Sequence, residues 1–300
     1  MVVGLPMLFA LDRGNLIVPC FAFFTLAHSG ILRSARLRWI ALALTINFKP
    51  YLILTILPNV IRRRWRAFEG CVVAGILIYL LTYSLLGEGT PFDMLSNMLN
   101  YTVKDMASYV ENAFYGASYS SIVGMLRSEF PMIATIGSRP VELLTFIFPI
   151  FILIGQIGVA LCFAGAALRP GTVPMRRLTA LGVIVVMSSV EVGGYAEVFF
   201  LFLVFFERWK GAGSIMALVA GYLLCISVDM PVVHVAREVR DSYLTNRTVG
   251  YDVGVYAGEL IRPGLILLIE YGLVAASLMD VARVWRTNRR VRGDLIAERA

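Results

Sequence analysis

Three short polar segments interrupt the apolar sequence and hold side chains that could do chemistry. They span residues 12–15, 45–51 and 191–195. Lys49 is a cation that could hold an anionic group, and Glu191 is a carboxylate that could accept a proton. Inside a bilayer, backbone N–H and C=O groups must be paired within the protein, so a break is tolerated only where it packs against protein or lines a wet cavity. The breaks therefore predict a polar site at membrane depth.

The composition places the chain among integral membrane proteins. Hydrophobic residues make up 58% of the 300 residues and charged residues only 16%, and the mean hydropathy is +0.76. A soluble domain of this size needs more polar surface than this. The four cysteines lie in or beside apolar runs, without the spacing of a metal site or a disulfide framework. The net charge of +7 resides in short clusters at the ends of apolar runs, which argues against nucleic-acid binding.

The apolar runs predict an all-α, polytopic membrane protein that forms a single transmembrane domain over residues 1–300. Several runs have about 12 residues, which gives a helix of only about 18 Å against a bilayer core of about 30 Å. We therefore expect about eight to ten membrane helices, some of them short or re-entrant.

Lysine and arginine predict the orientation of these helices. Of the 27 basic residues, 18 lie in residues 30–38, 62–67, 169–177, 207–213 and the tail 281–300. The positive-inside rule makes these segments cytoplasmic. All the polar breaks, two longer loops at about 87–140 and 230–262, and 15 of the 20 acidic residues then lie on the opposite side or at membrane depth. This distribution predicts an extracytoplasmic polar cavity.

Both longer loops are predicted to contain a helix. In the loop 87–140, residues 94–99 place apolar side chains at helical spacing, which favours an amphipathic helix on the membrane surface. In the loop 230–262, His234 and Glu238 belong to a mixed-charge run with spacings of four residues, which favours a solvated helix face with ion pairs.

The order and spacing of four segments resemble those of glycosyltransferase family 87, whose members are polytopic enzymes of the GT-C type. The segments are Arg13-Gly14-Asn15 before a short apolar helix, Asn47-Phe48-Lys49-Pro50-Tyr51, the serine-rich residues 118–125, and residues 188–195, which lack the proline and histidine of the family pattern. The resemblance covers roughly residues 1–206.

The resemblance implies transfer of a sugar, often mannose, from a polyprenyl-phosphate donor to a lipid or glycan acceptor on the extracytoplasmic face of the plasma (inner) membrane. The expected partners are this donor, the acceptor and membrane lipids, with no nucleic acid. We expect no cofactor and no metal, because the two histidines fall on opposite sides and no acidic triplet is present. Enzymes of the GT-C type generally place a catalytic carboxylate in their first extracytoplasmic loop. Because this chain begins inside what should be a later helix, we expect a relative shortened at its N-terminus.

Within this resemblance, Lys49 is the predicted contact for the donor phosphate. A fixed ammonium in a low-dielectric cleft stabilises the negative charge that grows on a phosphate leaving group. Arg13 is a second predicted phosphate contact, at a helix start whose amides favour anions; Asn15 and Asn47 complete this substrate-binding group. The alternatives are a lysine that extends to the interface, and an ion pair of Arg13 with Asp12 beside an ordinary asparagine cap.

Glu191, beside two glycines that allow close approach, is the preferred candidate for the general base, ahead of Glu197. The alternative is a structural carboxylate paired with a neighbouring cation. Tyr119 and Tyr195 are predicted to stack on a sugar, although interfacial aromatic belts also place tyrosines at these depths.

The sequence also allows three other interpretations of the function. A polymerase or ligase of O-antigen or exopolysaccharide would be expected to carry paired arginines in its outer loop, where this chain has only Arg127 and Arg139. A secondary transporter also uses broken helices with charged residues at mid-depth, but it predicts internal repeats and a site reachable from both faces. A catalytically inactive membrane scaffold is a further alternative.

Overall fold

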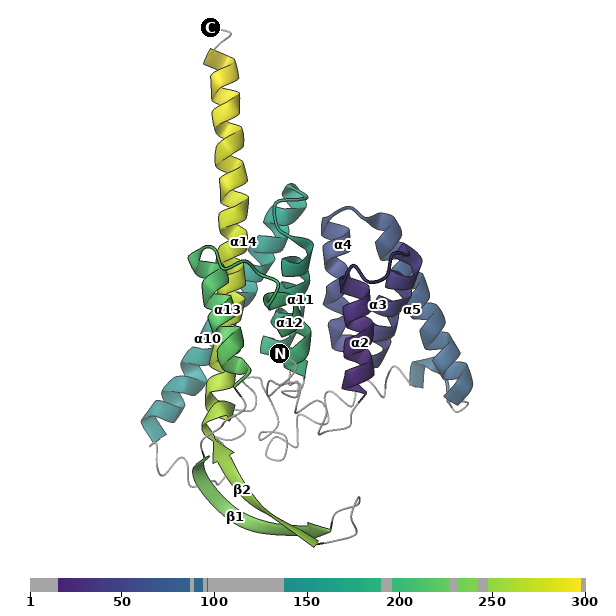
Figure 1. The fold of residues 1–300 in the computed structure, drawn as a ribbon, viewed down its shortest axis with the longest axis vertical. Helices are drawn as coiled ribbons and strands as arrows, with labels where there is room; N and C mark the ends of the chain where they lie inside the picture. Colours follow the sequence, from purple (N-terminus) through teal and green to yellow (C-terminus); the bar gives the residue numbers. More distant parts are fainter. Residues whose placement is uncertain are drawn as a thin grey trace.

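The protein is a bundle of helices with one two-stranded sheet at one end (Figure 1). The structure, a computed structural model, describes residues 16–86, 89–93, 96, 138–189, 196–226, 231–241 and 248–297. Most of these residues are helical, as the apolar runs predict. The predicted surface helix at 94–99 lies almost wholly outside the described residues.

The first group of helices consists of antiparallel neighbours that follow one another in the chain. Its members are α2 (Ile17–His28), α3 (Ala35–Phe48), the 3-10 helix η1 (Pro50–Ile56), α4 (Leu57–Ile61) and α5 (Trp65–Leu86). Helix α3 packs closely on α5 because Gly70 has no side chain: a Cβ there would lie 2.2 Å from Cε3 of Trp39. Glycine at this position thus sets the distance between the two helices.

The second group contains the longest helices. Its members are α10 (Ser138–Leu168), α11 (Met175–Ser189), α12 (Glu197–Val204), α13 (Ala212–Leu224) and α14 (Ala257–Ala297). Helices α13 and α14 meet at Gly213 and Gly272, where a Cβ on Gly213 would lie 2.5 Å from the Gly272 carbonyl oxygen. Small residues at such crossings let two backbones approach closely.

Two sets of contacts join the groups. A Cβ on Gly182 of α11 would lie 2.9 Å from the carbonyl oxygen of Leu54 in η1, so these backbones touch. Phe21 and Phe24 of α2 meet Phe199 of α12, with ring centroids 6.0 and 5.2 Å apart. Buried side chains of α2, η1 and the second group consequently form one large apolar core, while those of α3 and α5 pack in a smaller cluster with Ile56 of η1.

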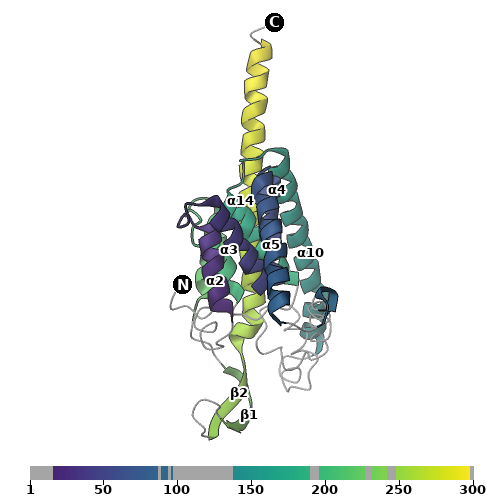
Figure 2. The same cartoon turned by 90° about the vertical axis from the view of Figure 1, so that its right-hand side faces the viewer.

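The sequence predicted a helix around residues 234–241, and this prediction was wrong. Residues in this run form strand β1 (Pro231–Asp241), which pairs antiparallel with β2 (Thr248–Tyr256). The run is rich in β-branched valine, a residue that favours strands, and spacings of four residues fit a strand as well as a helix because four is a multiple of two. The hairpin projects from one end of the bundle, opposite the C-terminal part of α14 (Figure 2).

The connections between helices separate into two sets in space. The basic connections 29–34, 62–64 and 169–174 lie at the upper end of the bundle in Figure 1, where α14 also extends toward its C-terminus. Helix α3 runs from the upper end toward the lower end, where the hairpin also lies, so the break that follows α3 in the chain is on the lower side. The charge distribution in the sequence predicts this separation.

Within the part of the chain that the structure describes, three helices are long and apolar enough to cross a membrane: Trp65–Leu85 of α5, Phe146–Leu168 of α10 and Ile261–Thr287 of α14. Only 6% of the apolar stretch of α5 and 17% of that of α10 is buried, so both helices expose leucine and isoleucine along most of their length, and α10 also exposes phenylalanine. Apolar surface of this extent is uncommon on soluble monomers and indicates association with a membrane. The other described helices are shorter, as predicted from runs of about 12 residues.

Candidate functional site

The break at Lys49 separates α3 from η1 and results from the proline that follows it. Proline lacks an N–H and disfavours helical dihedrals in the residue before it, and Lys49 has φ −139° and ψ 88°. The Lys49 N–H donates to the Thr45 carbonyl at 3.0 Å, and its carbonyl accepts from the Leu52 N–H at 2.9 Å. The backbone is therefore paired through the break, as required at membrane depth.

The side chain of Lys49 is half-buried and lies close enough to Cys20 of α2 to interact with it electrostatically. The Cys20 thiol donates to the Thr45 carbonyl, with Sγ and O 3.6 Å apart, and this contact holds α2 against the end of α3. An ammonium held beside two packed helices is more restricted than an exposed lysine.

Asn47 has a structural role that the sequence did not predict. Its side-chain Nδ2 donates to the Ala43 carbonyl at 2.9 Å and to the Gly75 carbonyl of α5 at 3.2 Å. The side chain of Asn47, predicted to bind substrate, thus links α3 to α5 through its amide nitrogen.

Asn47→Ala is expected to lower the free energy of unfolding by about 1–2 kcal/mol, because two hydrogen bonds of part-buried groups are lost. Detergent-induced unfolding of the purified protein measures this change. Thr82→Ala on α5 is the control: its exposed hydroxyl bonds only within its own helix, to Ile78, so a change within about 0.5 kcal/mol is expected. Equal losses in both variants would contradict the proposed link.

Five predicted site residues lie outside the described residues, so the structure places none of them. They are Arg13, Asn15, Tyr119, Glu191 and Tyr195.

Glu197 begins α12 and is almost fully buried, with 1% of its surface exposed. Its Oε1 has no hydrogen-bond partner among the described residues. Arg262, near the start of α14, and Cys225, at the end of α13, both interact with Glu197 electrostatically. Three helix ends therefore meet around this carboxylate, at the same end of the bundle as Lys49 (Figure 1).

Helix α14 carries a buried carboxylate that the sequence reading missed. Glu270 is fully buried, and neither of its carboxyl oxygens has a hydrogen-bond partner among the described residues. Its signal in the sequence is a lone glutamate in the apolar run 263–280. An ionisable side chain inside a membrane span is a candidate functional residue.

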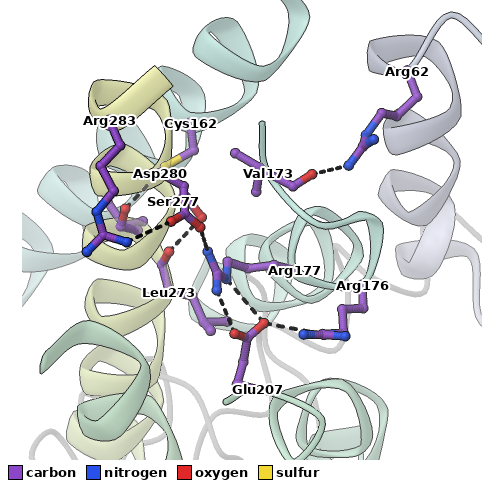
Figure 3. A network of polar contacts seen from close by, with 11 residues as sticks. Arg62, Cys162, Val173, Arg176, Arg177, Glu207, Leu273, Ser277, Asp280 and Arg283 are labelled. Carbon is purple, nitrogen blue, oxygen red and sulfur yellow. Dashed lines mark hydrogen bonds and ion pairs between the residues drawn. The ribbon is translucent and has the colours of Figure 1, made fainter. Parts of the chain in front are cut away.

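A second polar cluster lies at the start of α11 and centres on Arg177, which is paired with two carboxylates (Figure 3). Arg177 of α11 donates two hydrogen bonds to Glu207, at 3.1 Å from Nε and 2.6 Å from Nη2, and a third to Asp280 of α14 at 2.7 Å. Burial alone would lower the pKa of the Arg177 guanidinium, but the hydrogen bonds and charges of Glu207 and then Asp280 outweigh burial and raise it. This cluster is a structural clamp between helices.

The described residues include no group of three or more His, Cys, Asp or Glu side chains that could hold a metal ion. Comparison of the chain with models of protein families, with curated proteins and with solved structures found no match. The described residues define a helical protein with three helices able to cross a membrane, a half-buried lysine at a helix break, and three buried glutamates, of which Glu207 is paired with Arg177.

Proposed function

We propose that this protein is a multi-pass protein of the plasma membrane that transfers a sugar from a polyprenyl-phosphate donor to a lipid or glycan acceptor on the extracytoplasmic face. The observation that carries the proposal is the half-buried ammonium of Lys49 at a helix break, at the end of the bundle opposite the basic connections. An anionic lipid headgroup that arrives at this end meets a cation held at membrane depth.

The exposed apolar faces of α5 and α10 support a lipid-linked substrate. Lipid tails can pack against these faces along the length of the bundle. A polyprenyl chain can therefore lie in the membrane beside the bundle while its phosphate reaches the end that holds the Lys49 break. A donor of this kind needs no nucleotide-binding loop, and the sequence has no phosphate-binding glycine motif.

In the proposed transfer, the acceptor hydroxyl oxygen bonds to the sugar C1 while the bond from C1 to the phosphate oxygen breaks. The leaving polyprenyl phosphate gains negative charge, which the Lys49 ammonium stabilises. A carboxylate takes the proton of the acceptor hydroxyl. Among the described residues Glu197 suits this role, because it is a buried carboxylate with a free Oε1 at the same end; Glu191, the preferred candidate in the sequence, stays a second choice.

Lys49→Ala is expected to lower sugar transfer about 10²-fold, the order of loss seen when one transition-state charge contact is removed. The assay uses the protein in membrane vesicles with radiolabelled polyprenyl-phosphate mannose and measures label in lipid and glycan products. Lys210→Ala is the matched control, since Lys210 is exposed in the connection after α12.

Lys49→Arg keeps the positive charge and is expected to retain more transfer than Lys49→Ala. Full activity of a folded, membrane-inserted Lys49→Ala protein would refute the role of Lys49. Products that contain many repeat units would instead identify a polymerase.

A secondary transporter is the second candidate function, and the buried Glu270 within a membrane-spanning helix favours it. The two functions differ in access to the site. In a transferase, a cysteine placed at position 49 reacts with membrane-impermeant thiol reagents from the extracytoplasmic side only. Reaction from the cytoplasmic side, in any state of the protein, would favour transport.

A further inference from the structure

Glu270 lies near the middle of the longest apolar helix. It is nine residues after Ile261, where the membrane-spanning stretch of α14 begins, and ten residues before Asp280 in the paired cluster. At a rise of about 1.5 Å per residue these separations correspond to about 14 and 15 Å of helix. Glu270 is therefore remote from both polar ends of the bundle.

The walls around Glu270 come from α10 and α11. A Cβ on Gly155 of α10 would lie 2.9 Å from both Cδ and Oε1 of Glu270, so the carboxyl group rests directly on the backbone of α10. The Ser188 hydroxyl of α11 is the polar contact of the carboxyl group, but it does not meet hydrogen-bond geometry toward either oxygen and donates to the Val185 carbonyl at 3.3 Å. Three helices thus enclose a carboxyl group whose oxygens both lack a hydrogen-bond partner among the described residues.

Among the described side chains, no cation acts on the Glu270 carboxyl group. Arg262, earlier on α14, interacts with Glu197. Arg177 of α11 is bound to Glu207 and Asp280. The titratable neighbour of Glu270 is Tyr271, whose hydroxyl donates to the Phe151 carbonyl at 2.6 Å. Cys162, seven residues after Gly155 on α10, donates its thiol to the Val274 carbonyl, with Sγ and O 3.6 Å apart. The titratable residue of α13 is Tyr222, which is exposed and stacks on Trp209.

An ionised carboxylate without a counter-ion or hydrogen bonds is strongly disfavoured in a low-dielectric interior, so the neutral acid is the stable form. We propose that Glu270 is a proton-binding site in the membrane interior, enclosed by α10, α11 and α14, which holds its proton until water or another acceptor reaches it. The site is separate from the proposed transfer site at Lys49 and does not depend on it.

A proton fits this site better than a metal cation. Hard cations in proteins gather about six oxygen ligands. Ser188 is a described polar side chain beside the Glu270 carboxyl group, and the Phe151 carbonyl of α10 accepts from Tyr271. A proton needs only one carboxyl oxygen.

Modification by dicyclohexylcarbodiimide tests the proposal. This lipid-soluble reagent reacts with the protonated acid: the O–H adds across a C=N bond, and the adduct rearranges to a stable N-acylurea with no leaving group. The full-length protein in membrane vesicles is treated over a series of pH values, and peptide mass mapping locates the adduct. A water-soluble carbodiimide serves as the comparison reagent.

We expect dicyclohexylcarbodiimide to modify Glu270 and the water-soluble reagent to leave it unmodified. Labelling should fall about tenfold per pH unit once the acid ionises. Glu270→Gln should abolish the adduct, whereas Glu69→Gln, which changes an exposed carboxylate on α5, should leave it unchanged.

Three results would overturn the proposal. The first is that Glu270 carries no adduct at any pH, including pH values on the acid side of neutrality. The second is that both reagents modify Glu270 equally. The third is that sodium ions protect Glu270 at constant pH, which would assign the site to a metal cation. The wild-type pH series and peptide map decide the question even if Glu270→Gln does not fold. None of these measurements uses a sugar donor, so failure of the proposed transferase function would leave them unaffected.

Discussion

Replacing Arg177 with methionine is expected to lower the free energy of unfolding by about 3–5 kcal/mol, because it breaks a buried ion pair by removing one partner. Arg177 is 6% exposed and Glu207 is also 6% exposed, so water cannot compensate the carboxylate left behind. The clamp joins α11, the chain after α12, and α14. Its loss therefore acts on the tertiary structure of the second group of helices (Figure 3).

Arg176→Met is the matched control for this experiment. Arg176 approaches Glu207 at 3.6 Å, but its side chain is 40% exposed, and such pairs contribute about 0–1 kcal/mol. Unfolding of both purified variants by a denaturing detergent, followed by tryptophan fluorescence, gives the comparison. If the Arg177 and Arg176 variants lose the same small amount, the clamp contributes nothing specific to stability.

Gly272→Ala is expected to destabilise the protein by about 1–3 kcal/mol or more, as overpacking of a tight interface does. A Cβ at this position would lie 2.6 Å from the Gly213 carbonyl oxygen and 2.8 Å from the Ala217 nitrogen. Both are backbone atoms of α13, which cannot move aside as a flexible side chain can. The two helices must therefore separate, and the surrounding core loses contacts.

Gly264→Ala, on the same helix, is the control: it measures how a change from glycine to alanine affects stability when the new Cβ meets no other atom. A Cβ at Gly264 meets nothing within 4 Å, and alanine favours a helix interior over glycine by about 0.5–1 kcal/mol. The control is thus expected to be neutral or slightly stabilising. The loss in Gly272→Ala should appear in the melting temperature in detergent and in protease resistance. Equal stability of the two variants would contradict the close contact of α13 and α14.

The break at Lys49 was predictable because its cause is local. Proline ends a helix through its own ring and missing N–H, whatever the rest of the chain does. The short lengths of α2 and α3 follow in the same way from the polar residues that bound them. The separation of the basic connections to one end was also predictable, since antiparallel helices joined by short turns alternate between two ends.

Other features could not be read from neighbouring residues. The Asn47 amide bonds to Gly75, and the Glu270 carboxyl group rests on Gly155; each pair is far apart in the sequence. The mixed-charge run ahead of α14 is a strand because it pairs with β2, and the spacing of its charges did not decide between helix and strand. The roles assigned to the residues outside the described ranges stay predictions.

The sequence alone determined the apolar composition, the short helices, the break at Lys49 and the one-sided arrangement of basic residues, because hydropathy, proline and charge act over a few residues. Only the tertiary structure decided which polar side chains are paired and which are buried without a partner. Arg177 and Glu270 are both ionisable groups next to apolar sequence, yet Arg177 binds two carboxylates, whereas among the described residues the Glu270 carboxyl group lies against a glycine and a serine. The difference depends on which helices pack together, and long-range packing fixes that.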